Sequence, residues 1–119
     1  MKATAPRRAN PHKLTPSLVR ARLEPVFSRH KVLKAILFGS VARGEPSRHS
    51  DVDLIIVQRS DKRFLDRYEG LLYELGTALP EASVEALIYT PEELNSLARS
   101  RRFIARALEE GQVIYESDG

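Results

Sequence analysis

The sequence contains no cysteine and no long apolar run. Without cysteine, the chain can form neither a disulfide scaffold nor a cysteine zinc site. The longest stretch free of charged residues is Ala35–Ala42, whereas a membrane-spanning helix needs about 20 apolar residues. The first residues also lack the apolar segment of a secretory signal. We therefore expect a cytoplasmic protein with no membrane contact.

Acidic residues are absent before Glu24, although basic residues are frequent there. Residues 1–14 also contain Pro6 and Pro11 and show no apolar periodicity, which predicts a flexible basic tail. Such a tail is either a solvated terminus or a weak electrostatic contact for nucleic acid. The rest of the 119-residue chain has the size of one domain, which we place at residues 15–116.

The apolar residues alternate between helical and strand-like spacing along the chain. Thr15 and Pro16 predict the start of a helix that Pro25 should kink or split. Thr90 and Glu93 form a capping box that should begin another helix. We predict strands at 32–38, 52–57, 84–89 and 112–115, a short helix at 40–43, a long helix at 61–79, and helices up to 110 with a break near Ser100. This order predicts an α/β (α+β) fold, a mixed sheet of about four strands with helices packed on one face.

Two short motifs at the ends of predicted strands indicate the chemistry. Gly39-Ser40 follows the first strand, where free backbone N–H groups favour a phosphate and glycine permits close approach. The second strand begins Asp51-Val52-Asp53. Residues i and i+2 of a strand face the same way, so the two carboxylates repel each other unless a cation lies between them. Hard oxygen ligands favour Mg²⁺ or Mn²⁺.

Gly39-Ser40, ten intervening residues and Asp51-Val52-Asp53 together resemble the signature of the DNA polymerase β-like nucleotidyltransferase superfamily. The longer runs 38–45 and 50–54 resemble its minimal nucleotidyltransferase branch, and residues 103–116 resemble how those domains end. The likeness covers residues 15–116. It implies a polymerase β-like nucleotidyltransferase fold and transfer of a nucleotide, AMP from ATP, to an acceptor hydroxyl with two Mg²⁺ ions.

The resemblance also implies roles for individual residues. Asp51 and Asp53 would hold the metal ions, and Gly39 and Ser40 would bind the departing phosphates. A third acid belongs on the next strand, where the sequence has Glu85 instead of the usual aspartate. The alternative for Glu85 is an edge-strand side chain turned to solvent. Arg43 either reaches a phosphate or forms a surface salt bridge.

The predicted catalytic fold takes up nearly the whole chain, so we expect another protein to supply the acceptor. In the minimal branch the usual partner is a helical HEPN-type toxin, and AMP transfer to a tyrosine of that toxin makes the nucleotidyltransferase an antitoxin. A homodimer is also possible, and the face of residues 99–106 is our predicted contact surface. The alternative function is a non-catalytic antitoxin that neutralises its partner by binding alone.

Overall fold

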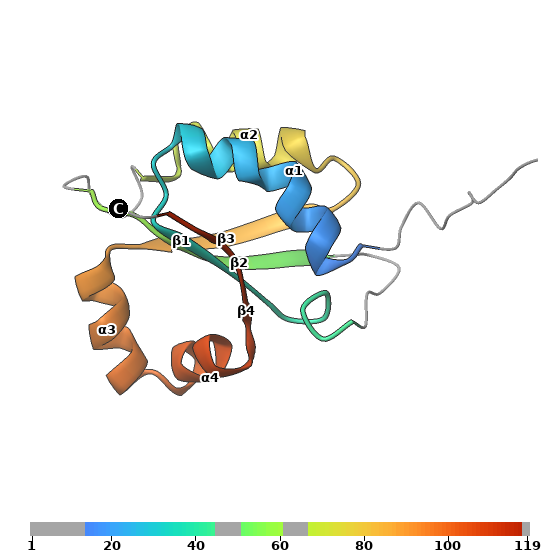
Figure 1. Ribbon diagram of the computed structural model, residues 1–119. Helices are drawn as coiled ribbons and strands as arrows, with labels where there is room; N and C mark the ends of the chain where they lie inside the picture. Colours follow the sequence, from blue (N-terminus) through green and yellow to red (C-terminus); the bar gives the residue numbers. More distant parts are fainter. Residues whose placement is uncertain (1–13, 45–50, 61–66, 118–119) are drawn as a thin grey trace, which may run out of the picture.

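The computed structural model describes residues 14–44, 51–60 and 67–117. Within these ranges the helices and strands alternate as the sequence predicts (Figure 1). The helices are α1 (Pro16–Arg29), α2 (Leu71–Ala78), α3 (Pro91–Ser100) and α4 (Arg102–Glu110); the strands are β1 (Lys34–Phe38), β2 (Asp51–Val57), β3 (Ser83–Tyr89) and β4 (Gln112–Glu116).

The four strands form one mixed sheet in the order β3-β2-β1-β4. Strand β1 pairs antiparallel with both β2 and β4, whereas β2 and β3 run parallel. The parallel pair is connected through α2, since parallel strands need a crossover connection. Strand β4 lies at one edge of the sheet. The prediction of a mixed four-stranded sheet is therefore confirmed.

Helices cover both faces of the sheet, so the prediction of helices on one face is incomplete. Helices α1 and α2 lie on one side and α3 and α4 on the other (Figure 1). The first face holds the larger core, in which Phe27, Leu37 and Leu75 are fully buried. On the second face Ile55 and Ile104 form a smaller cluster. Strand residues point alternately to the two faces, so β1, β2 and β3 each contribute to both clusters, whereas β4 contributes only to the larger one.

The predicted helix starts are present. The Thr15 hydroxyl accepts a hydrogen bond from the Leu18 amide at 3.1 Å, and α1 begins at Pro16. Thr90 and Glu93 make the predicted capping box. The predicted break near Ser100 separates α3 from α4. The predicted interruption at Pro25 is wrong, because α1 runs unbroken through it to Arg29.

Two helix predictions need correction. Residues 61–66 of the predicted 61–79 helix lie outside the described residues, and the observed helix starts only at Leu71. Gly70 precedes it with a φ of 80°, a conformation that ends helical geometry on that side. Residues 40–43 form a turn rather than a short helix, with the Arg43 amide bonded to the Gly39 carbonyl at 3.2 Å.

The predicted tail lies outside the described residues except for Leu14, which is packed into the larger core with 2% exposure. Leu14 therefore packs as part of the folded domain. Among the helices in the described ranges, none is both long and apolar enough to cross a membrane.

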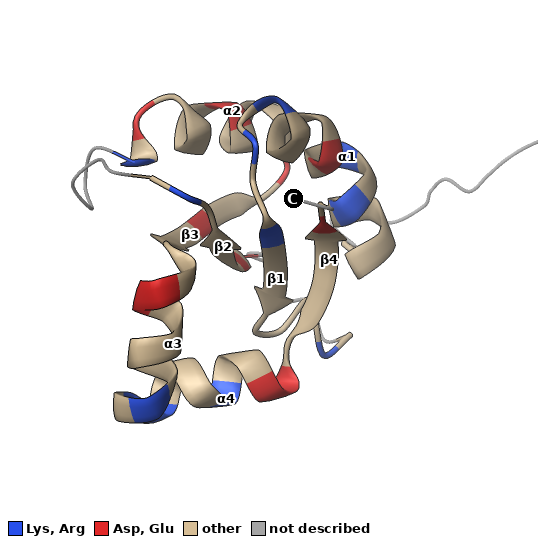
Figure 2. Cartoon of the chain, turned by 60° about the vertical axis from the view of Figure 1, so that its left-hand side comes forward, with Lys and Arg blue, Asp and Glu red and all other residues tan. Residues whose placement is uncertain are grey.

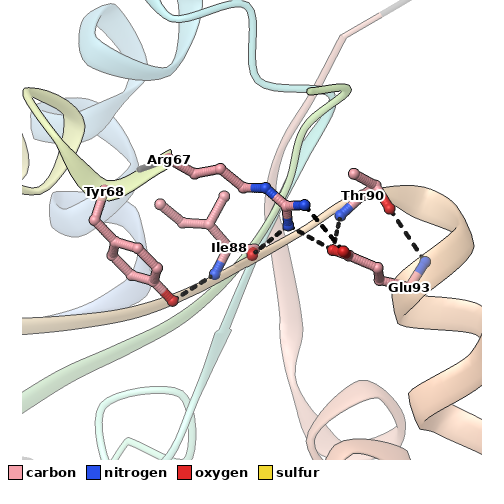
Figure 3. Close-up of polar contacts among 5 residues, drawn as sticks. All are labelled: Arg67, Tyr68, Ile88, Thr90 and Glu93. Atoms are coloured by element: carbon pink, nitrogen blue, oxygen red, sulfur yellow. Dashed lines mark hydrogen bonds and ion pairs between the residues drawn. The ribbon is translucent and has the colours of Figure 1, made fainter. Parts of the chain in front are cut away.

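A buried ion pair fixes the start of α3 against the sheet (Figure 3). The Arg67 guanidinium contacts the Glu93 carboxylate through two hydrogen bonds of 2.5 and 2.9 Å. Arg67 also donates to the Ile88 carbonyl at 3.4 Å, and the Tyr68 hydroxyl accepts from the Ile88 amide at 3.0 Å. Glu93 Oε1 accepts from the Thr90 amide at 3.0 Å. Residues before α2 are thus bonded to both β3 and α3.

Replacing Glu93 with glutamine is expected to lower the free energy of unfolding at pH 7 by about 2 kcal/mol, because it leaves a buried guanidinium without its counter-charge. The Arg67 side chain is 6% exposed. Hydrogen bonds from Arg67 lower the pKa of Glu93 to about 2 from 4.5. The stabilisation is therefore complete above about pH 4.5 and is lost as the pH falls toward 2.

Urea unfolding of both proteins at several pH values measures this difference. Glu92→Gln is the matched control, since Glu92 is 78% exposed and lies 4.0 Å from Arg59. It should change the free energy of unfolding by less than about 0.5 kcal/mol. Equal effects of the two substitutions would contradict the importance of the buried pair.

Candidate functional site

The three predicted acids lie on adjacent strands at one place on the sheet. Asp51 and Asp53 are both on β2, two residues apart, and so project to the same face. In the strand register Asp53 is opposite Phe38 of β1 and Glu85 of β3. Neighbouring strands lie about 4.8 Å apart. Ile55, two residues after Asp53, packs in the cluster with Ile104 of α4. The face that carries the acids is therefore the one that α3 and α4 partly cover.

Gly39 brings the backbone directly against Asp53. Its φ is 82°, in the left-handed region that favours glycine, and a Cβ atom at this position would lie 2.5 Å from Asp53 Oδ2. The turn that follows is held from β4, where the Gln112 side chain donates to the Ala42 carbonyl at 2.7 Å. The end of β1 and the carboxylate of Asp53 are thus packed together, as the two motifs predict.

The pKa of Asp53 is raised above its usual value. Partial burial is the largest cause, followed by repulsion from Glu85 and then from Asp51. The three carboxylates therefore influence one another electrostatically. Mutual repulsion of this kind is expected of acids that are placed to share a cation.

Two cavities meet at Asp53. The larger, about 520 Å³, lies between the Gly39 turn and α4, and the smaller, about 330 Å³, lies over the ends of β2 and β3. The larger is lined by Phe38, Gly39, Arg43, Asp53, Arg102, Phe103, Arg106, Ala107 and Glu110. The smaller is lined by Phe38, Asp53, Leu54, Glu85, Ala86, Leu87 and Phe103. Among the described residues, those that line both cavities are Phe38, Asp53 and Phe103.

The structure places the other predicted site residues unevenly around these cavities. Arg43 lines the larger cavity and Glu85 the smaller. Ser40 lies in the turn next to Gly39, and Asp51 is exposed at the start of β2; neither lines either cavity. Glu85 is exposed on the edge strand β3, but on the same side as Asp53.

Sequence reasoning missed the contribution of α4. Arg102 and Arg106 were interpreted as part of a solvated or partner-binding face, yet both line the larger cavity. Phe103 makes an edge-to-face contact with Phe38, with ring centroids 5.7 Å apart and an interplanar angle of 79°. The i, i+4 spacing of the two arginines places them on one side of a helix. The sequence therefore indicates that Arg102 and Arg106 lie on the same side of α4, but it does not indicate that this side faces the cavity.

Removing the charge of Asp53 is expected to stabilise the metal-free protein. Asp53→Asn should raise the free energy of unfolding at pH 7 by roughly 1 kcal/mol, a typical size for one substitution. The folded-state pKa is raised, so wild type loses stability as the pH rises through it, whereas asparagine does not titrate. Below about pH 3.8, the usual pKa of an aspartate, the carboxyl is protonated in both the folded and the unfolded state, and the difference should vanish.

Thermal melts in a chelator at neutral and acidic pH measure this effect. Glu109→Gln, a change at an exposed position on α4, is the control for loss of one negative charge. A lower stability of Asp53→Asn than of wild type at pH 7 would show that the carboxylates do not repel each other in the folded protein.

The acids also suit a magnesium ion that is bound partly by the protein and partly by a substrate. In the part of the chain that the structure describes, no group of three or more His, Cys, Asp or Glu side chains is arranged to hold a metal ion by itself. Mg²⁺ is usually bound by one or two carboxylates together with substrate phosphates rather than by a complete protein cage. Paired carboxylates beside an open cavity fit that arrangement.

Comparison with known proteins agrees with this fold. Residues 21–119 match the family described as polymerase beta, nucleotidyltransferase. The chain therefore belongs to the polymerase β nucleotidyltransferase family, in its minimal branch. Two similar proteins come from Methanocaldococcus jannaschii. "Putative protein adenylyltransferase MJ0604" is 38% identical over 73% of this chain and 82% of its own length. "Putative protein adenylyltransferase MJ0435" is 34% identical over 60% of this chain and 74% of its own length.

Solved structures show the same fold. A structure described as a minimal nucleotidyltransferase is 29% identical, with a TM-score of 0.61 over 82% of this chain and 94% of the other. A toxin–antitoxin structure with AMP-PNP has a TM-score of 0.60 at 20% identity, over 83% of this chain and 74% of the other. A mutant MntA–HpeT toxin–antitoxin structure has a TM-score of 0.59 at 17% identity, with the same coverage.

Proposed function

We propose that the protein is a Mg²⁺-dependent protein adenylyltransferase that moves AMP from ATP to a hydroxyl of a partner protein. The observation that carries this proposal is the position of Asp53. Its carboxylate lies against the Gly39 turn, opposite Glu85, and borders both cavities. Asp53 thus borders one cavity beside the Gly39 turn and a second cavity beside Glu85. Transfer of AMP needs such a group, because the nucleotide and the acceptor must meet at one place.

The residues have distinct tasks in this mechanism. Gly39 and Ser40 would receive the β- and γ-phosphates, because the turn exposes backbone N–H groups without a side chain at Gly39. Arg43, on the same turn, lines the larger cavity and would add a positive charge. Asp51, Asp53 and Glu85 would hold the magnesium ions. Bound there, these ions would neutralise charge on the phosphates and orient the reacting oxygens.

The transfer exchanges one phosphorus–oxygen bond for another. The acceptor oxygen bonds to the α-phosphorus, and the bond from that phosphorus to the bridging oxygen of pyrophosphate breaks. Pyrophosphate leaves with the electron pair of that bond. The hydroxyl proton passes to a carboxylate beside the smaller cavity, where Asp53 and Glu85 lie in register on adjacent strands.

The biological role that we propose is that of an antitoxin. The similar proteins named as protein adenylyltransferases support the activity. The toxin–antitoxin structures of the same fold support a complex with a partner protein. We propose a helical HEPN-type toxin as that partner, with a tyrosine hydroxyl as acceptor.

Label transfer from ATP tests this proposal. The protein is incubated with the product of the neighbouring gene, Mg²⁺, and ATP labelled either at the α- or at the γ-phosphate. Label should reach the partner from α-labelled ATP alone, and a chelator should abolish the transfer. If the partner is silenced without any transfer, the alternative is correct and the protein neutralises by binding alone.

A further inference from the structure

Helix α4 places an exposed aromatic ring between the two cavities. Phe103 is 59% exposed, which is unusual for a large apolar side chain beside a core, and it lines both cavities. Its ring contacts Phe38 at the end of β1, edge to face. The next turn of α4 is anchored by Ile104 and Ala107, which are buried against the sheet. The position of the ring is therefore fixed by packing of the helix that carries it.

The two cavities differ in charge. The larger is lined by Arg43, Arg102 and Arg106 against two carboxylates, Asp53 and Glu110. Arg106 and Glu110 form an exposed ion pair of 3.3 Å, one turn apart on α4. Basic residues also lie where α3 meets α4 (Figure 2).

In the smaller cavity the only charged lining residues within the described ranges are Asp53 and Glu85. Apolar side chains, among them Leu87 and Phe103, form most of the rest.

We infer that Phe103 divides the site into a nucleotide side and an acceptor side, and that Arg102 and Arg106 bind the polyphosphate of the nucleotide. This inference rests on the proposed function. A nucleoside triphosphate carries several negative charges, and guanidinium groups bind phosphate through paired hydrogen bonds. Among the described residues, such groups line the larger cavity and not the smaller, and the 520 Å³ of the larger is within the usual range of ligand pockets.

The acceptor side follows from the same division. An incoming group there meets the ring of Phe103 and the side chain of Leu87, with Glu85 at the edge. This lining favours an apolar group that carries the hydroxyl. The shared residue, Asp53, borders both sides, so the α-phosphorus and the acceptor oxygen meet next to it.

The nucleotide side is tested by equilibrium binding of ATP, which needs no partner and no turnover. Arg102→Gln and Arg106→Gln should each weaken ATP binding roughly tenfold, the expected effect of losing one charge-assisted contact. Arg99→Gln is the matched control, because Arg99 is exposed near the end of α3 and lines neither cavity. All three arginines are exposed, so their replacement should leave the fold intact.

The acceptor side is tested by steady-state kinetics with the partner. Leu87→Phe, which narrows the smaller cavity, should raise the KM for the partner about tenfold and leave ATP affinity unchanged. Phe103→Ala should raise the KM for the partner and also weaken ATP binding, because the ring borders both cavities. Tyr73→Ala is the control for loss of an exposed aromatic; Tyr73 is 77% exposed on α2, on the opposite face of the sheet.

The outcomes separate the inference from the proposed function. Unchanged ATP affinity in both arginine variants would overturn the inference even if AMP transfer occurs normally. Equal loss of ATP affinity in Leu87→Phe would show one undivided site. If wild type binds ATP with the predicted arginine dependence but transfers no AMP, the division stands and the proposed activity fails.

Discussion

Replacing Asp53 with asparagine is expected to reduce AMP transfer on the order of a thousandfold, similar to removing a central electrostatic group from an active site. The substitution keeps the shape of the side chain and removes its charge. Asp53 borders both cavities and touches the Gly39 turn, so nucleotide and acceptor both depend on it. Metal affinity and stabilisation of the phosphate charge should fall together. Mg²⁺-dependent transfer of α-labelled AMP, followed over time, measures the loss.

Two substitutions at Glu85 serve as controls for this result. Glu85→Gln should also slow transfer, whereas Glu85→Asp keeps the charge and should retain much of the rate. Thermal melts of all variants show whether they are folded. Asp53→Asn is expected to be more stable than wild type without metal. A lower melting temperature would therefore show that activity was lost through unfolding and not through loss of the charge. Normal transfer by Asp53→Asn would contradict the catalytic role.

The relative position of Asp51 and Asp53 could be predicted from sequence because it depends on a local rule. A strand turns each successive side chain to the opposite face, so the Asp51–Asp53 spacing alone places both carboxylates together. Glu85 was predicted from the family resemblance, and parallel pairing of β2 and β3 brings it into register with Asp53. That pairing joins segments far apart in the sequence, so spacing alone could not predict it.

The role of α4 could not be predicted in this way, because it depends on which face of the sheet the helix covers. The spacing of Arg102 and Arg106 shows only that they share one side of α4. The side chains line the cavity because Ile104 and Ala107 turn the helix toward Ile55 on the sheet. The predicted 61–79 helix departs from the structure at residues 67–70 for a different reason. Apolar spacing continues across Gly70, but the backbone there adopts a positive φ.

Replacing Gly39 with alanine is expected to reduce AMP transfer by about a hundredfold or more, because a displaced catalytic group costs about that much. The new Cβ atom would lie 2.5 Å from Asp53 Oδ2, closer than atoms in contact can approach. The carboxylate must therefore rotate away from the turn, or the turn must move away from β2. Either movement separates the phosphate-binding backbone from the acid. Steady-state kinetics with α-labelled ATP and the partner measure the loss.

A substitution at a second glycine distinguishes the effect of the contact between the new Cβ atom and Asp53 from the effect of backbone strain. Gly39 and Gly70 have nearly equal φ values of 82° and 80°, but a Cβ atom at Gly70 meets nothing within 4 Å. Alanine at either position carries the cost of a left-handed backbone, about 1 kcal/mol or more. Gly70→Ala should therefore lose stability but keep its rate of AMP transfer, whereas Gly39→Ala should lose both. Equal retention of activity in the two variants would mean that Asp53 can move without consequence, and the close contact between Gly39 and Asp53 would then have no catalytic role.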